Sequence, residues 1–166
     1  MKFLEKDLED IIWESDNIKL RKRGLSITGI KKRQLKIGNY GISDLVTFSK
    51  YINEFDGEFS NGIIVTVYEL KKEKAGISAF LQALRYCKGI KTYLDKRKPN
   101  INVFFKIVLV AKEIDTDSDY IFLTDFINYE LEDGCLFSVE NYSFKYDIDG
   151  ITFKSHSEYN LIDKGF

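Results

Sequence analysis

The chain has 166 residues, of which 44% are hydrophobic and 31% charged, a composition typical of one folded domain and not of a disordered chain. No apolar run approaches the roughly 18 residues of a membrane span, and acidic residues near the start are unlike a signal peptide, so we expect a cytoplasmic protein with no membrane partner. One His and two Cys exclude a His-rich zinc site and a disulfide framework. Any catalysis must therefore depend on carboxylates, lysine, tyrosine or an oxygen-liganded metal.

The net charge of −1 conceals two basic segments. Residues 17–43 contain no acid, and their basic residues are Lys19, Arg21, Lys22, Arg23, Lys31, Lys32, Arg33 and Lys36. Residues 71–98 are also strongly basic, whereas residues 113–163 are acidic. Two basic segments on one face would suit a polyanion. A solvated surface is the simpler interpretation of a charge run alone, and the pI of 5.9 is low for a plain nucleic-acid-binding domain.

Apolar residues at helical spacing predict an amphipathic helix in the first fifteen residues. Residues 34–37 and 42–48 are predicted strands, separated by a turn at 38–41. A second turn region is expected at 55–57 and 61–62, before a β-branched strand at 63–71.

The apolar spacing becomes helical from residue 77 to about 93, and Pro99 closes this helix. The run at 103–111 predicts a central strand covered on both faces. A further strand is expected at 120–123, and the tail from residue 135 alternates, with a hairpin turn at 149–150. This order predicts an α/β protein with one mixed sheet flanked by helices.

Five polar residues within these elements indicate a site. Asp44 stands in an otherwise apolar strand, where an unpaired acid is costly. Glu69 and Lys71 are two residues apart at a strand end and so share a face. Gln82 and Tyr86 are four apart on the following helix. Two carboxylates and a lysine suit phosphodiester hydrolysis with Mg²⁺, although a capped strand-end acid and a surface ion pair would explain the same residues without function.

Taken together, Asp44, Glu69-Leu70-Lys71 and the Q-x-x-x-Y element from Gln82 to Tyr86 resemble the motifs of the PD-(D/E)xK nuclease superfamily, in particular its NucS-like and RecB-like branches. Residues 5–9 resemble the E-x-x-L-E helix of the NucS-type catalytic domain, and residues 41–45 its G-x-x-D-L strand. The resemblance implies a single domain over residues 1–166. Its restriction-endonuclease-like α-β-β-β-α-β core would cover about 1–124, with a β-rich C-terminal extension over about 125–166.

The resemblance also implies roles for individual residues. Asp44 and Glu69, with the Leu70 carbonyl, would bind Mg²⁺ or Mn²⁺, and Lys71 would act on the attacking water. Gln82 would position water, and Glu5 would reach the site from the first helix, with Glu9 the weaker candidate. The expected contacts to the substrate are Tyr86, Lys72, Lys74, Arg85 and Arg33.

The sequence thus favours a metal-dependent deoxyribonuclease, an endonuclease acting on DNA. Two alternatives stay open: a catalytically inactive nucleic-acid-binding or assembly module that keeps the fold, and a protein-binding adaptor whose acidic tail docks a basic partner. The sequence does not decide between DNA and RNA. A homodimer and a protein partner that supplies DNA specificity are also open.

Overall fold

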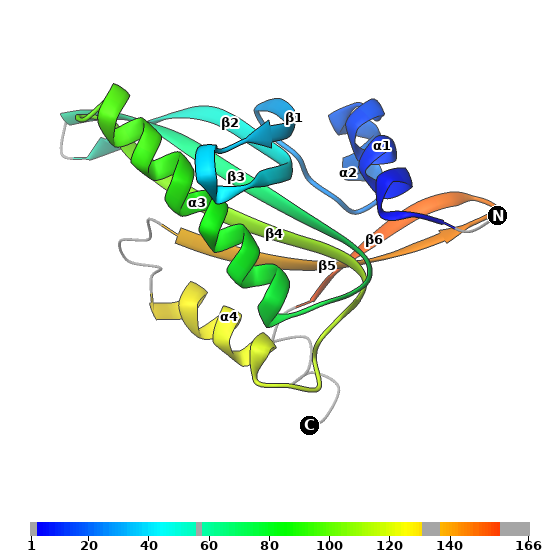
Figure 1. Cartoon of the computed structure of the whole chain (residues 1–166). Helices are drawn as coiled ribbons and strands as arrows, with labels where there is room; N and C mark the ends of the chain where they lie inside the picture. The colour runs from blue at the N-terminus through cyan, green and yellow to red at the C-terminus, as the bar shows by residue number, and fades with distance from the viewer. Residues whose placement is uncertain (1–2, 56–57, 131–136, 157–166) are drawn as a thin grey trace.

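The computed structural model describes residues 3–55, 58–130 and 137–156. Within these residues the strands form a six-stranded sheet in the order β1-β2-β3-β4-β5-β6 (Figure 1). The elements are α1 (Glu5–Glu14), α2 (Asn17–Lys22), β1 (Ile30–Lys36), the 3₁₀ turn η1 (Gly38–Tyr40), β2 (Ile42–Phe55), β3 (Glu58–Ala75), α3 (Ile77–Arg97), β4 (Asn102–Ile114), α4 (Tyr120–Glu130), β5 (Phe137–Asp147) and β6 (Gly150–His156). The predicted α/β class with a mixed sheet flanked by helices is confirmed.

Neighbouring strands differ in direction along the sheet. β1, β2 and β3 pair antiparallel, and β3 pairs parallel with β4 across the α3 crossover. β4 pairs parallel with β5 across α4, and β5 and β6 form an antiparallel hairpin. The hairpin turns at Gly150, whose φ of +102° favours glycine. β5 and β6 therefore continue the sheet that the N-terminal strands begin, and α4 crosses the expected boundary near residue 124.

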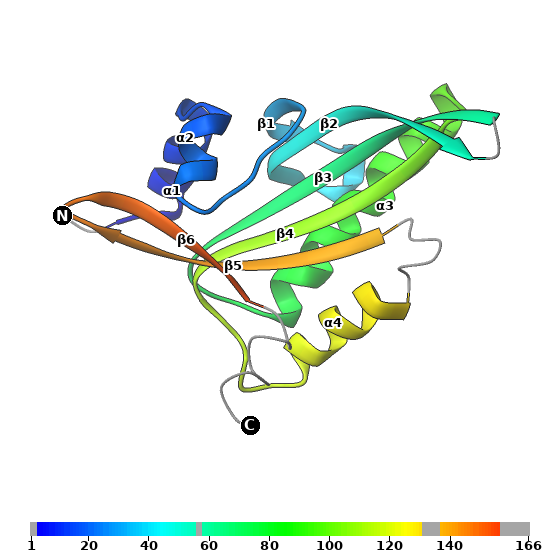
Figure 2. The same ribbon diagram turned by 180° about the vertical axis from the view of Figure 1, so that it is seen from behind.

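Side-chain alternation along the strands divides the core into two layers. Val67 and Ile107 belong to the cluster packed against α3 and α4, whereas Tyr68 and Val108 belong to the cluster under α1 and α2. α3 lies in front of the sheet in Figure 1 and behind it in Figure 2. In the described ranges, no helix is both long enough and apolar enough to cross a membrane.

Two predicted elements are wrong. Residues 120–123 are the first turn of α4, not a strand, because Tyr120, Ile121 and Thr124 are buried at helical spacing. Residues 61–62 lie inside β3 rather than in a turn. Gly62 leaves room there for the Tyr51 ring, because a Cβ atom would lie 2.1 Å from Cε1 of Tyr51 in its present position.

Candidate functional site

Asp44 and Glu69 meet on adjacent strands. The β2–β3 ladder pairs Leu45 with Tyr68, so its next step brings Asp44 beside Glu69. By alternation both carboxylates share the sheet face of Val46 and therefore of α3. Asp44 Oδ2 accepts a hydrogen bond of 3.0 Å from the backbone N–H of Leu70. The structure thus brings the two strand carboxylates together at the ends of their apolar runs.

Lys71 completes this group from the same strand. Its Nζ donates to Glu69 Oε1 at 2.6 Å, and Glu69 is only 1% exposed. The pair is therefore not the surface ion pair of the simpler interpretation. Among the described residues, Glu69 Oε2 is buried and has no hydrogen-bond partner. A buried carboxylate oxygen without a partner is costly, and a hard cation is a ligand that would satisfy it.

Burial governs the protonation of these acids. It raises the pKa of Glu69 to about 7, with the Lys71 hydrogen bond opposing and the Asp44 charge adding to the shift. Burial also raises the pKa of Asp44, against the Leu70 N–H and the Lys71 charge. Burial alone would lower the pKa of Lys71, but the hydrogen bond and charge of Glu69, together with the charges of Glu5 and Asp44, outweigh burial and raise that pKa. The three groups form one electrostatically coupled cluster, as candidate catalytic groups often do.

Helix α1 brings two further acids to this cluster. Glu5 is exposed, and its Oε2 accepts a hydrogen bond of 3.3 Å from the backbone N–H of Lys72. Its charge acts on both Asp44 and Glu69. Glu5 therefore lies close enough to the strand carboxylates to act on them electrostatically.

Glu9 is held more firmly than Glu5. It is 8% exposed, accepts a hydrogen bond of 2.8 Å from Gln34 Nε2 and contacts Arg33 Nε. Arg33 also pairs with Asp10, so its guanidinium binds α1 carboxylates rather than standing free for a phosphate. Arg33 thereby fastens α1 against β1.

Gln34 is a further candidate residue that the sequence did not indicate. It falls between the ladder pairs Arg33–Leu45 and Leu35–Ser43, which puts it across from Asp44. Its φ of +49° is uncommon for a residue other than glycine, and such backbone strain concentrates at functional sites. No sequence signal predicts a left-handed residue inside a strand, so this position could not be found beforehand.

Helix α3 contributes Gln82 and Tyr86. Gln82 Nε2 donates to Tyr86 Oη at 2.8 Å, and Tyr86 is buried. The tyrosine ring packs below Gly41, where a Cβ atom would lie 3.0 Å from Cε1, three residues before Asp44. Tyr86 is therefore placed to support Gln82, and its burial disfavours the direct substrate contact that the resemblance implies.

The remaining predicted cations lie around this cluster without forming part of it. Lys72 pairs with Glu73 at 3.4 Å, and Lys74 pairs with Asp115 at 3.2 Å. Arg85 is exposed, with its guanidinium 6.0 Å from the centre of the Tyr86 ring. These ion pairs are accessible to solvent and weak, so a phosphate could compete for the lysines.

Comparison with known proteins finds no relative: no protein-family model, no curated protein and no solved structure matches the chain.

Within the described part of the chain, no group of three or more His, Cys, Asp and Glu side chains is arranged to hold a metal ion. The carboxylates that could hold a metal at this cluster are Asp44 and Glu69. This number suits Mg²⁺, which keeps several waters and commonly takes one or two protein carboxylates together with substrate phosphate.

Proposed function

We propose that the chain is a metal-dependent nuclease that hydrolyses phosphodiester bonds of DNA. The observation that carries the proposal is the meeting of Asp44, Glu69 and Lys71, with Glu69 Oε2 buried and unpartnered. The element order supports it: α1, the β1–β3 meander, α3 and the parallel strand β4 follow the α-β-β-β-α-β arrangement that the motif resemblance implies.

Each residue would have a distinct task. Asp44 and Glu69, with the Leu70 carbonyl, would hold Mg²⁺ or Mn²⁺. The chemistry that such an ion supplies is neutralisation of the scissile phosphate and activation of the attacking water. Lys71 would act on the attacking water and offset the negative charge that builds on the phosphate. Gln82, whose amide is hydrogen-bonded to Tyr86, would orient water.

The test is nicking of a supercoiled plasmid and cleavage of labelled single-stranded DNA and RNA, with Mg²⁺, with Mn²⁺ and with EDTA. We expect divalent-dependent cleavage of DNA that falls at least about a hundredfold in Asp44→Asn and Lys71→Met. Asp149→Asn and Lys50→Met change exposed residues of the same types and should cleave like the wild type. Circular dichroism and thermal midpoints establish that the variants are folded.

Two results would contradict the proposal. Cleavage that survives both site substitutions in folded protein would assign the activity elsewhere. DNA binding without cleavage in either metal would instead support the inactive binding module.

A further inference from the structure

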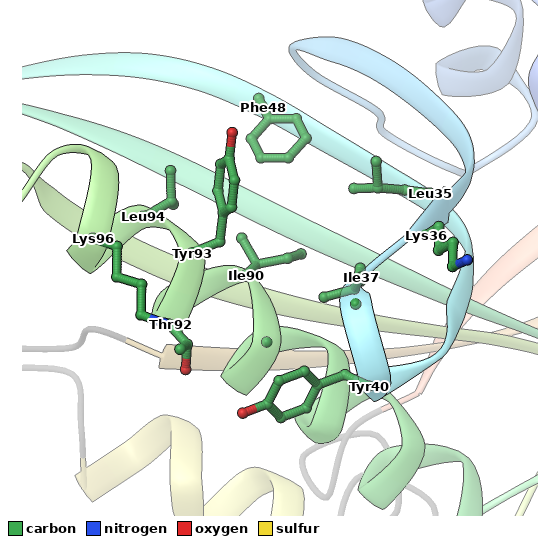
Figure 3. A pocket seen from close by; sticks show the side chains of 12 residues that line it. Leu35, Lys36, Ile37, Tyr40, Phe48, Ile90, Thr92, Tyr93, Leu94 and Lys96 are labelled. Atoms are coloured by element: carbon green, nitrogen blue, oxygen red, sulfur yellow. The ribbon is translucent and has the colours of Figure 1, made fainter.

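A groove of about 540 Å³ opens between η1, β1 and the C-terminal half of α3 (Figure 3). Three aromatic residues line it: Tyr40, Phe48 and Tyr93. Tyr93 is 58% exposed, and the Arg97 guanidinium lies over its ring at 5.4 Å from the ring centre, so the rest of the ring is available to a ligand. Ile37 and Ile90 supply apolar lining between the rings. The groove has the size and apolar character of a ligand site.

The groove depends on the close approach of η1 to α3. A Cβ atom on Gly89 would lie 2.5 Å from Cγ2 of Ile37 and 2.7 Å from Cγ of Tyr40. The glycine therefore lets Tyr40 lie directly against the helix. The aromatic lining is a consequence of this packing.

The groove lies between the two basic segments seen in the sequence. Lys36 comes from the first segment and Lys96 from the second; both are exposed, and Figure 3 shows them on opposite sides of the groove. None of the described residues that line the groove is acidic. The nearby Asp95 of α3 is neutralised by Lys91 at 2.8 Å. The charge of this surface is thus complementary to a polyanion.

We propose that this groove binds a single-stranded stretch of nucleic acid. Its bases stack on Tyr93, Phe48 and Tyr40, and its phosphates lie near Lys36 and Lys96. Aromatic rings within a positively charged groove are the means by which proteins bind single strands without sequence preference. A duplex keeps its bases stacked on one another, so it would leave the aromatic lining unused.

This inference rests on the proposed function, which makes nucleic acid the substrate. It restricts that substrate to nucleic acid with a single-stranded part. Tyr93 follows Gln82 by eleven residues on α3, which corresponds to about 16 Å along the helix axis. One strand could therefore occupy both the groove and the candidate site. The substrate would be a nucleic acid with a single-stranded portion, not a fully paired duplex.

The test is fluorescence anisotropy of the full chain in EDTA, which prevents cleavage, with labelled oligo-dT, oligo-U and a blunt duplex as probes. Tyr93→Ala should weaken single-strand binding about tenfold through lost stacking, with little effect on the duplex. Lys36→Ala and Lys96→Ala should each lower the slope of log affinity against log salt by about 0.7. Phe122→Ala and Lys154→Ala change an exposed aromatic residue and an exposed lysine elsewhere and should bind normally.

If Tyr93→Ala and the wild type bind the single strand with equal affinity, the groove inference is wrong. It is also wrong if Tyr93→Ala changes only the association of the protein with itself and not its affinity for the oligonucleotide. Comparing oligo-dT with oligo-U shows whether the strand is DNA or RNA. The two proposals fail separately. Lys71-dependent cleavage with no role for Tyr93 leaves the nuclease proposal standing, whereas Tyr93-dependent binding without any cleavage supports the groove alone.

Discussion

Glu69 combines full burial with a free carboxylate oxygen, and this combination has a measurable consequence. Burial makes its ionised form less favourable in the folded chain than in the unfolded one, so the folded pKa of about 7 lies above the ordinary value of 4.5. An acid whose pKa is higher in the folded than in the unfolded chain contributes to the free energy of unfolding, and this contribution is fully present below about pH 4.5. That contribution is lost as the pH rises through about 7.

Glu69→Gln should remove this pH dependence. Between pH 5 and pH 8 in EDTA, the free energy of unfolding of the wild type should fall relative to that of the variant by about 1–3 kcal/mol. Urea unfolding at several pH values measures the difference, and Glu14→Gln, an exposed acid of α1, is the matched control. A difference that stays constant with pH, or that grows in favour of the wild type, would contradict the assignment of the titration to Glu69.

Some residues of the candidate site could be predicted from the sequence, and others could not. Asp44 was indicated as an acid within an apolar strand, and strand periodicity put Glu69 and Lys71 on one face. That these residues belong together was expected only from the motif resemblance. The contacts of Glu9 with Arg33 and Gln34 join residues more than twenty positions apart, and neither periodicity nor composition encodes such a pairing. Long-range polar contacts of this kind required the fold.

At the scale of elements, helix α1 depends on a residue of β1. Its last turn carries no basic residue that could interact with the helix C-terminus. Lys31 supplies that charge instead, since its Nζ donates to the carbonyl oxygens of Ile12, Trp13 and Ser15 at 3.3, 3.1 and 2.8 Å. The same contact holds α1, and therefore Glu5, in its place beside the strand carboxylates.

Lys31→Met should destabilise the protein by about 1–2 kcal/mol, because several C-terminal carbonyls lose a charged donor. It should also change the fluorescence of Trp13, whose ring centre lies 6.0 Å from Lys31 Nζ. Lys32→Met, on the exposed side of β1, is the control and should unfold like the wild type. Equal unfolding midpoints for the two variants would show that α1 is held by its apolar face alone.

Elements with strong periodicity were predicted, and the others were not. Helix α3 and strands β3 and β4 showed clear apolar patterns. The first turn of α4 did not, because Phe122 and Leu123 are large apolar residues that stay partly exposed and hide the helical spacing. The six-residue helix α2 also escaped notice, although Asp16 caps its N-terminus by accepting a hydrogen bond of 2.8 Å from the backbone N–H of Lys19. Short or uniformly apolar segments take their structure from the surrounding fold.

At the scale of the whole molecule, the two core layers share their strands. β3 and β4 contribute alternate residues to the layer under α1 and to the layer under α3 and α4. Neither layer can lose these strands without exposing the other. The sheet therefore couples the N-terminal helices to β5 and β6, the strands of the β-rich extension that was expected within the single domain.

Asn141 allows this coupling to be measured. It is buried in β5, where its Oδ1 accepts a hydrogen bond of 2.6 Å from Tyr120 Oη and its Nδ2 donates to Thr124 Oγ1 at 3.1 Å. Asn141→Leu leaves two buried hydroxyl groups of α4 without this partner, so we expect a loss of about 2–4 kcal/mol.

If the sheet unfolds as one unit, this loss should reach α1, which packs on the opposite face of the sheet from α4. Urea unfolding of Asn141→Leu should give the same lowered midpoint by far-UV circular dichroism and by the fluorescence of Trp13, the one tryptophan of the chain, which lies on α1. Glu140→Gln, at the preceding and more exposed position of β5, is the control, and its midpoint should stay near that of the wild type. The contrary outcome is a Trp13 fluorescence transition that keeps its wild-type midpoint while the dichroism transition becomes biphasic. The C-terminal strands would then unfold independently, and the chain would comprise two cooperative units.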